Sequence, residues 1–169
     1  MLIQRKIGNL ATFAIDNRRI DRVPVQWYET NKRILHKRTQ SGRELVLKFL
    51  KEAPGLAQDD ILFEDALSLV VIDIPPCEAI VLRPQNMHQM ASLCYEIGNK
   101  HLPLFYENDE ILVPFEAPLF RLLQAAGFEP VEQIRKLLYP VRTSVAPHSH
   151  SSGGTLFSKI LQLTTSASD

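Results

Sequence analysis

Short apolar runs alternate with polar turn residues through the first half of the chain. Runs of this length that are rich in Leu, Ile and Val are typical of β-strands. The strands predicted from them are 2–7, 23–29, 34–38, 44–50, 61–63 and 67–74. The stretch Gln40-Ser41-Gly42 predicts a hairpin turn between two of these strands, because glycine adopts a positive φ without strain. Strands at this spacing predict a small β-sandwich or barrel.

The stretch Ile74-Pro75-Pro76-Cys77 interrupts this pattern. Two successive prolines donate no hydrogen bond to a sheet and stiffen the backbone. We therefore predict a domain boundary here, with an N-terminal β domain over residues 1–75.

Beyond the prolines the apolar spacing becomes helical. A helix is predicted to begin near Asn86 and to end at Gly98, since glycine takes the left-handed conformation that stops a helix. The apolar residues that recur at helical spacing, and that we expect to form its buried face, are Met87, Met90, Ala91, Cys94 and Ile97.

The rest of this half predicts a complete second fold unit. Strands are predicted at 79–82, 102–106, 111–113 and 131–138. A second helix is predicted over 116–126, and its inward-facing residues are expected to be Leu119, Leu122 and Leu123. The order β-α-β-β-α-β predicts a ferredoxin-like domain over residues 76–142. The fold class of the whole chain is therefore α+β.

The last part of the chain, residues 143–169, is rich in Ser, Thr, Pro, His and Gly up to Gly154. This composition predicts a flexible C-terminal tail. Residues 156–161 carry the apolar positions of one short amphipathic helix, whose length makes it marginal on its own.

Composition excludes several classes of protein. The 19 basic and 19 acidic residues give a net charge of zero, which argues against a nucleic-acid partner held through phosphates. No window approaches the ~20 apolar residues of a membrane span, and the start of the chain lacks a signal peptide. The two cysteines form no Cys-x-x-Cys unit. We therefore expect a cytoplasmic protein with no membrane association.

Three of the five histidines are candidates for metal binding. His101 closely follows the predicted helix end, and His148 and His150 stand two residues apart in the tail, where an extended chain can direct both imidazoles at one ion. Three imidazoles do not fill an octahedral shell. A two-fold homodimer would place His101 beside its mate and bring two tails to the same ion.

Imidazole ligands suit nickel, copper or zinc, and the lack of clustered thiolates argues against a structural zinc site. The simpler interpretation is a surface histidine at a helix end, where a positive charge suits the dipole, and a solvated polar tail. We expect His36 and His88 to be exposed surface residues and Cys94 to be a core residue.

Enzyme signatures are sparse. The chain has no phosphate-binding glycine-rich loop, no Gly-x-Ser-x-Gly and no His-Glu-x-x-His. The acidic pairs Asp59-Asp60 and Glu64-Asp65 are interpreted as solvated turn residues. Two alternatives to metal delivery stay open: a scaffold or maturation factor with no physiological metal role, and a metal enzyme, for which no general base is evident.

Four stretches resemble one known family. The segment Tyr95-Glu96-Ile97-Gly98-Asn99-Lys100-His101 is similar to the most recognisable motif of UreE, the urease accessory protein that acts as a nickel metallochaperone, in which a helix ends in Gly-Asn-Arg/Lys-His. The further stretches that resemble this family are 37–45, 56–62 and 114–118.

This resemblance implies an N-terminal β domain that engages partners or peptides and a C-terminal ferredoxin-like domain for metal binding and dimerisation. It places His101 at the symmetric dimer interface and makes His148 and His150 the tail ligands. The implied cargo is Ni(II), and Zn(II) or Cu(II) can bind the same site. The implied partners are the GTPase UreG and the urease pre-activation complex.

Two departures from the family pattern affect these expectations. The usual Gly-Asp of the early stretch is Asp59-Asp60 here, so the turn can differ. Some members carry extra histidines where this chain has residues 114–117, so no peripheral metal site is expected at the second helix.

Overall fold

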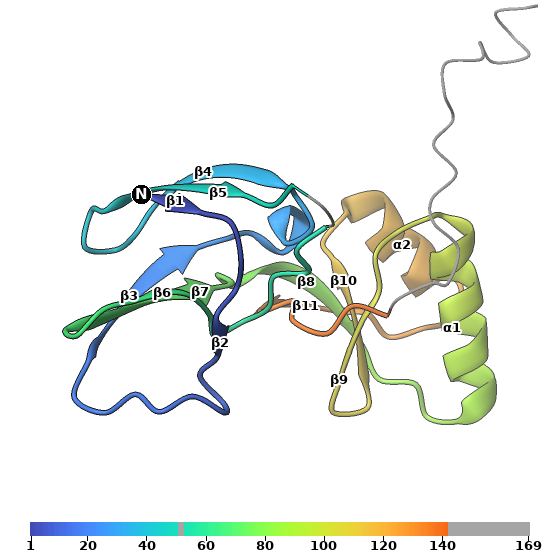
Figure 1. The fold of residues 1–169 in the computed structure, drawn as a ribbon. Helices are drawn as coiled ribbons and strands as arrows, with labels where there is room; N and C mark the ends of the chain where they lie inside the picture. Colours follow the sequence, from blue (N-terminus) through green and yellow to red (C-terminus); the bar gives the residue numbers. More distant parts are fainter. Residues whose placement is uncertain (51–52, 142–169) are drawn as a thin grey trace, which may run out of the picture.

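Two small sheets face each other in the first half of the computed structural model, which describes residues 1–50 and 53–141 (Figure 1). The first has the order β1-β5-β4, with bounds Leu2–Ile3, Glu44–Lys48 and Ile34–Arg38. The second has the order β2-β6-β7-β3, with bounds Gly8–Asn9, Asp60–Glu64, Ser68–Asp73 and Arg19–Pro24. Both sheets contribute to one buried apolar cluster, whose members include Leu45, Leu47, Val70 and Ile72. The prediction of an N-terminal β-sheet domain is confirmed.

Two predicted strands of this half are wrong in part. The strand expected over 23–29 ends at Pro24, and a 3-10 helix, η1 (Trp27–Glu29), follows it. Proline removes a ladder donor, and the Glu29 carboxylate accepts a hydrogen bond from the Gln26 backbone N–H at 3.0 Å, which favours the helical turn. The strand expected over 2–7 is also shorter and ends at Ile3.

The acidic pair Asp59-Asp60, at the start of β6, was expected to be solvated, but its carboxylates bind other residues of the chain. Asp60 is only 5 % exposed, and its carboxylate accepts hydrogen bonds from Lys6, Asn9 and the Ala57 backbone N–H. The neighbouring Asp59 pairs with Arg22 at 2.9 Å. Both carboxylates are therefore used to hold the fold together.

The second half forms one antiparallel sheet with both helices. Its strands are β8 (Cys77–Leu82), β9 (Phe105–Glu107), β10 (Glu110–Pro114) and β11 (Val131–Arg135), and its helices are α1 (Met87–Asn99) and α2 (Ala117–Ala125). The sheet order β11-β8-β10-β9 is that of a ferredoxin-like fold, so this prediction is confirmed.

The buried faces of the two helices differ from the expected ones. On α1 the fully buried residues are Leu93 and Ile97, whereas Met87 is 82 % exposed and Ala91 and Cys94 are also exposed. On α2 Leu119 and Leu123 are buried as predicted, but Leu122 is 39 % exposed. The helices rest on the sheet along Leu93/Ile97 and Leu119/Leu123, and neighbouring apolar positions are left outside this contact.

The two halves touch through residues that are distant in sequence. The ring of Trp27 packs edge-on against Phe105 of β9, with centroids 5.7 Å apart. Lys136 Nζ lies 2.8 Å from Asp73 Oδ1, and Leu138 packs against the N-terminal core. The predicted division at residues 75 and 76 stays a prediction, and the predicted tail lies outside the described residues. Neither helix in the described part combines the length and apolarity needed to cross a membrane.

Candidate metal centre

His101 lies directly beyond α1 and has a left-handed backbone with φ +55°. Its side chain is exposed. The prediction that Gly98 ends the helix is wrong, because the helix continues to Asn99 and Gly98 has no positive φ. The residue that takes the glycine-like conformation is the candidate ligand itself.

The backbone around His101 forms a Schellman motif, the common helix-ending pattern of two crossed hydrogen bonds. The His101 N–H donates to the Gly98 carbonyl at 2.9 Å, and the Leu102 N–H donates to the Ile97 carbonyl at 3.4 Å. A metal cation here would also meet the negative end of the α1 dipole.

The end of α2 shows the same motif with a different residue at its turning point. The Gly127 N–H donates to Gln124 and the Phe128 N–H donates to Leu123, both at 3.1 Å. Gly127 has φ +84° and occupies the position that His101 takes at α1. This position normally favours glycine because a Cβ costs free energy there. A histidine at the α1 end therefore indicates a role for its side chain.

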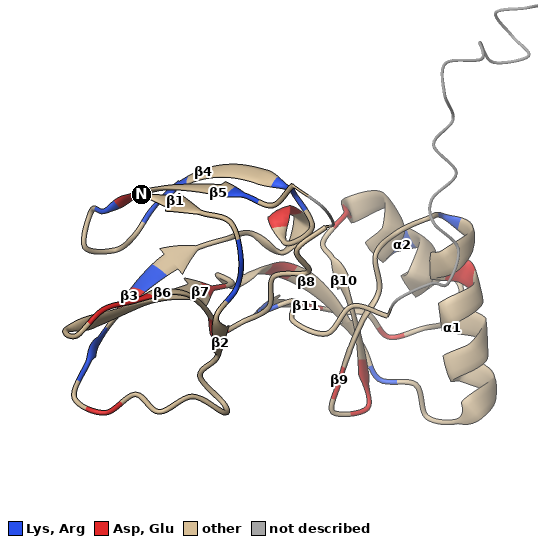
Figure 2. Cartoon of the chain, viewed as in Figure 1, with Lys and Arg blue, Asp and Glu red and all other residues tan. Residues whose placement is uncertain are grey.

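A second apolar stripe on α1 leads toward His101, and none of residues 1–50 and 53–141 covers it. Met87, Ala91, Cys94 and Tyr95 are exposed and recur at helical spacing, and Tyr95 is 70 % exposed. The helix carries little charge along its length (Figure 2). Sequence reasoning missed this stripe by assigning three of its residues to the core. The available signal was that apolar residues cover more of α1 than one face needs.

Gly98 extends the same stripe. A Cβ added at Gly98 would meet no atom of the described residues within 4 Å, so packing among these residues does not require glycine there. Glycine inside a helix costs about 1 kcal/mol relative to alanine. A close approach by another molecule at this point would account for it.

The end of the described chain lies beside the same region. The Val141 N–H donates to the Leu104 carbonyl at 2.8 Å, and the Tyr106 N–H donates to the Tyr139 carbonyl at 3.1 Å. Residues 139–141 thus run antiparallel along β9 toward Leu104, three positions beyond His101. The predicted strand 131–138 instead ends as β11 at Arg135. His148 and His150 lie outside the described residues.

The other candidate groups are not assembled around a metal. His36 and His88 are exposed, as predicted, on β4 and on the first turn of α1. Cys77 and Cys94 are both free, and desolvation raises the pKa of each thiol above its usual value. Within residues 1–50 and 53–141, no three His, Cys, Asp or Glu side chains are grouped to hold an ion.

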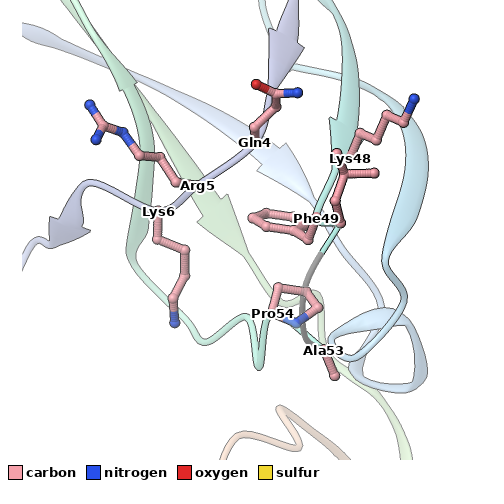
Figure 3. A pocket seen from close by; sticks show the side chains of 8 residues that line it. Gln4, Arg5, Lys6, Lys48, Phe49, Ala53 and Pro54 are labelled. Atoms are coloured by element: carbon pink, nitrogen blue, oxygen red, sulfur yellow. The ribbon is translucent and has the colours of Figure 1, made fainter.

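A hollow of about 530 Å³ opens in the N-terminal half, between the chain after β1 and the end of β5 (Figure 3). The Phe49 ring lies in the middle of the labelled side chains, and Arg5 and Lys48 extend away from it. Among the described residues that line it, three are cationic, namely Arg5, Lys6 and Lys48, and none is acidic or a histidine. These residues offer a metal cation no ligand of the kind expected at the candidate site.

Comparison with known proteins matches both halves of the chain to one family. Residues 3–74 match the N-terminal domain of the UreE urease accessory protein, and residues 76–155 match its C-terminal domain. The second match includes the positions of all three candidate histidines.

Individual relatives agree with this match. The chain is 42% identical to the urease accessory protein UreE of Flavobacterium johnsoniae over 96% of this chain and 99% of the relative. It is 45% identical to that of Actinobacillus pleuropneumoniae over 83% of this chain and 77% of the relative. Identity to that of Acetivibrio thermocellus is 34%, over 89% of this chain and 98% of the relative.

Proposed function

The chain belongs to the UreE family of urease accessory proteins, and on this basis we propose that it binds Ni(II) as cargo at a homodimer interface and delivers it to apo-urease. As a member of an accessory family it is not an enzyme. The nickel ion is what the protein carries, so the site has to release it as well as hold it.

The observation that carries the proposal is the exposed apolar stripe of α1 with His101 at its end. A face of this kind is stabilised by packing against another apolar surface, and a second copy offers an identical one. Two α1 helices that cross about a two-fold axis near Gly98 bring the two His101 imidazoles together. The negative ends of both helix dipoles then favour a cation between them.

The tail histidines are proposed as additional ligands. His148 stands seven positions after Val141, and an extended chain spans up to about 25 Å over seven Cα–Cα steps. From Leu104 back to His101 the chain spans at most about 10 Å. His148 and His150 are therefore within reach of His101 of the same or the second copy. Ligands on such an arm favour exchange over permanent retention.

The proposed ligand set suits transfer because it consists of imidazoles. Nickel, zinc and copper all accept imidazole, so cellular supply decides which ion is loaded. Two free thiols also fit the reducing cytoplasm in which we place this function.

We further propose that three segments of the chain have different roles. Residues 76–142 form the metal-binding and dimerisation domain, and residues 143–169 form the histidine-bearing arm. Residues 1–75 form the β domain that engages UreG and the urease pre-activation complex. The alternative, a scaffold without a metal role, would use this β domain alone and would leave the α1 stripe and the left-handed His101 without a purpose.

Nickel calorimetry on the wild-type protein and on His101→Ala, with sedimentation to count subunits, tests the proposal. We expect half an equivalent of tightly bound nickel per chain in the wild type and its loss in His101→Ala. His36→Ala and His88→Ala are matched controls, since each removes an exposed imidazole elsewhere, and both should bind like the wild type. Unchanged binding by His101→Ala, or a monomeric wild type, would refute the interface site.

A further inference from the structure

The two helix ends pose the question of what holds His101 in its left-handed conformation. At α2 the matching position is Gly127, which adopts this conformation freely. At α1 the residue has a Cβ, so the conformation must be imposed by its surroundings. The stripe residues lie on the preceding turns, and the residue that follows His101 directly is Leu102.

Leu102 makes two contacts that define the turn. Its backbone N–H donates to the Ile97 carbonyl, the outer of the two crossed bonds of the motif, at 3.4 Å. Its half-buried side chain packs against the apolar cluster beneath α1 that contains Leu93 and Ile97. A hydrophobic contact between the positions that Leu102 and Ile97 occupy commonly accompanies the Schellman motif.

Because Leu102 is anchored to the core, the chain has to reverse direction within His101. Without this anchor the backbone of His101 would relax toward the conformations that a residue with a Cβ prefers. The direction of its Cα–Cβ bond would change with it, and the imidazole would no longer be held at one place at the helix end.

We propose that Leu102 is the positioning residue of the metal site: its anchoring against the core under α1 holds His101 in the left-handed conformation that presents its imidazole. This inference rests on the proposed nickel-binding function. The Leu102 side chain has no donor atom for the metal and acts only through His101.

The chain offers its own control. Phe128 occupies the position at α2 that Leu102 occupies at α1, with the same kind of backbone bond and a half-buried side chain on the same apolar cluster. Leu102→Ala and Phe128→Ala each remove the apolar anchor of one helix end. Both changes weaken the fold, but only the first loosens a helix end that carries a candidate ligand.

The experiment is nickel calorimetry on full-length wild type, Leu102→Ala, Phe128→Ala and the conservative Leu102→Met, with circular dichroism to verify folding. We expect Leu102→Ala to raise the nickel Kd about tenfold at unchanged stoichiometry, since only a minor fraction of the protein would keep the competent His101 geometry. Phe128→Ala should bind like the wild type, and Leu102→Met should restore most of the affinity. NMR chemical shifts of the residue 101 backbone should move in Leu102→Ala and not in Phe128→Ala.

The results that would overturn the role of Leu102 differ from those that would overturn the proposed nickel-binding function. Equal nickel Kd values for Leu102→Ala and wild type, or equal losses for Leu102→Ala and Phe128→Ala, would overturn the positioning role while leaving the proposed function intact. If Leu102→Ala does not fold, the milder Leu102→Val takes its place: a raised nickel Kd together with moved residue 101 shifts decides for the role, and a wild-type Kd with unmoved shifts decides against it. A wild type that binds no nickel, or a His101→Ala variant that binds it normally, would overturn the proposed function and this inference with it.

Discussion

At position 101 the chain places a histidine where steric considerations favour glycine. The α2 end has Gly127 in the same motif, so the fold itself shows which residue the motif accepts without cost. A side chain kept in a costly backbone conformation points to selection for its chemistry rather than for stability.

Replacing His101 by glycine should therefore separate stability from function. We expect His101→Gly to increase the free energy of unfolding by about 0.5–1 kcal/mol, because the steric cost of the left-handed Cβ exceeds the added chain entropy of glycine. The same change should abolish the proposed nickel binding. Urea unfolding and nickel calorimetry on the same samples measure the two effects.

The matched comparison for this variant is His101→Ala, which lacks the imidazole but keeps the Cβ. It should lose nickel without gaining stability. If His101→Gly proved less stable than His101→Ala, the strain assigned to this position would be absent.

At the scale of elements, α1 differs from α2 in having two apolar stripes. Leu93 and Ile97 face the sheet, and the second stripe, with Met87 and Tyr95, faces outward. Gly98 continues the outward stripe, although no atom in the part of the chain that the structure describes crowds it. We interpret the second stripe as the surface on which a second copy packs.

Gly98→Ala should have opposite effects on the protomer and on the dimer. Alanine stabilises the helix by about 0.5–1 kcal/mol, but its methyl group would separate two helices that meet at this point. We expect a higher dimer dissociation constant, measured by sedimentation equilibrium over a range of concentrations.

Gln124→Ala, an exposed change on α2 that also favours helix, should leave the dimer dissociation constant unchanged. Tighter or equal dimerisation of Gly98→Ala would show that the helices do not meet there.

For the molecule as a whole, buried and half-buried carboxylates hold the fold together at neutral pH. Burial alone would raise the pKa of Asp21, but hydrogen bonds from Ser41 and Thr39 lower it below its usual value. The pKa values of Asp73 and Glu110 are likewise lowered: burial opposes the shift, and bonds to Lys136 and Arg135 prevail. Asp73 also joins the two halves through Lys136.

These shifts predict two acid transitions at different pH. Carboxylates with a lowered pKa in the folded state contribute stability that is complete above their unfolded values of about 3.9–4.3 and is lost as pH falls through the folded values. Protons compete with a metal ion for a free imidazole, so nickel affinity should fall as pH drops below ~6.5. At pH ~5 the protein should therefore be folded and should bind nickel more weakly.

A pH titration followed by nickel calorimetry and by fluorescence of the single tryptophan tests this prediction. Trp27 suits the measurement because it packs between the N-terminal core and Phe105 of the second half. Nickel affinity that stays flat down to pH 5 would argue against imidazole ligands. If the protein unfolded over the same pH range in which nickel affinity falls, carboxylates with a lowered pKa would not be the groups that set its acid stability.

The expectations that failed concern features that a short stretch of sequence does not determine. The period of the α1 sequence predicted a helix but not its covered face, because Leu93 and Cys94 are equally apolar neighbours and only the sheet beneath decides between them. Gly98 is a better local stop than His101, yet the helix continues to Asn99 and the left-handed residue is His101. Asp60 was expected in solvent because its hydrogen-bond partners Lys6 and Asn9 are about fifty positions away in sequence.

The sequence by itself determined the order of strands and helices in the second half, the α+β class, the family, and the three histidines proposed as ligands. These features follow from spacing and residue type along short stretches, which a linear chain carries directly. Tertiary structure alone decided the left-handed backbone of His101, the uncovered stripe of α1 and the approach of Val141 to Leu104. Each of these depends on contacts between segments that the fold brings together, and such contacts leave no mark in the local pattern of either segment.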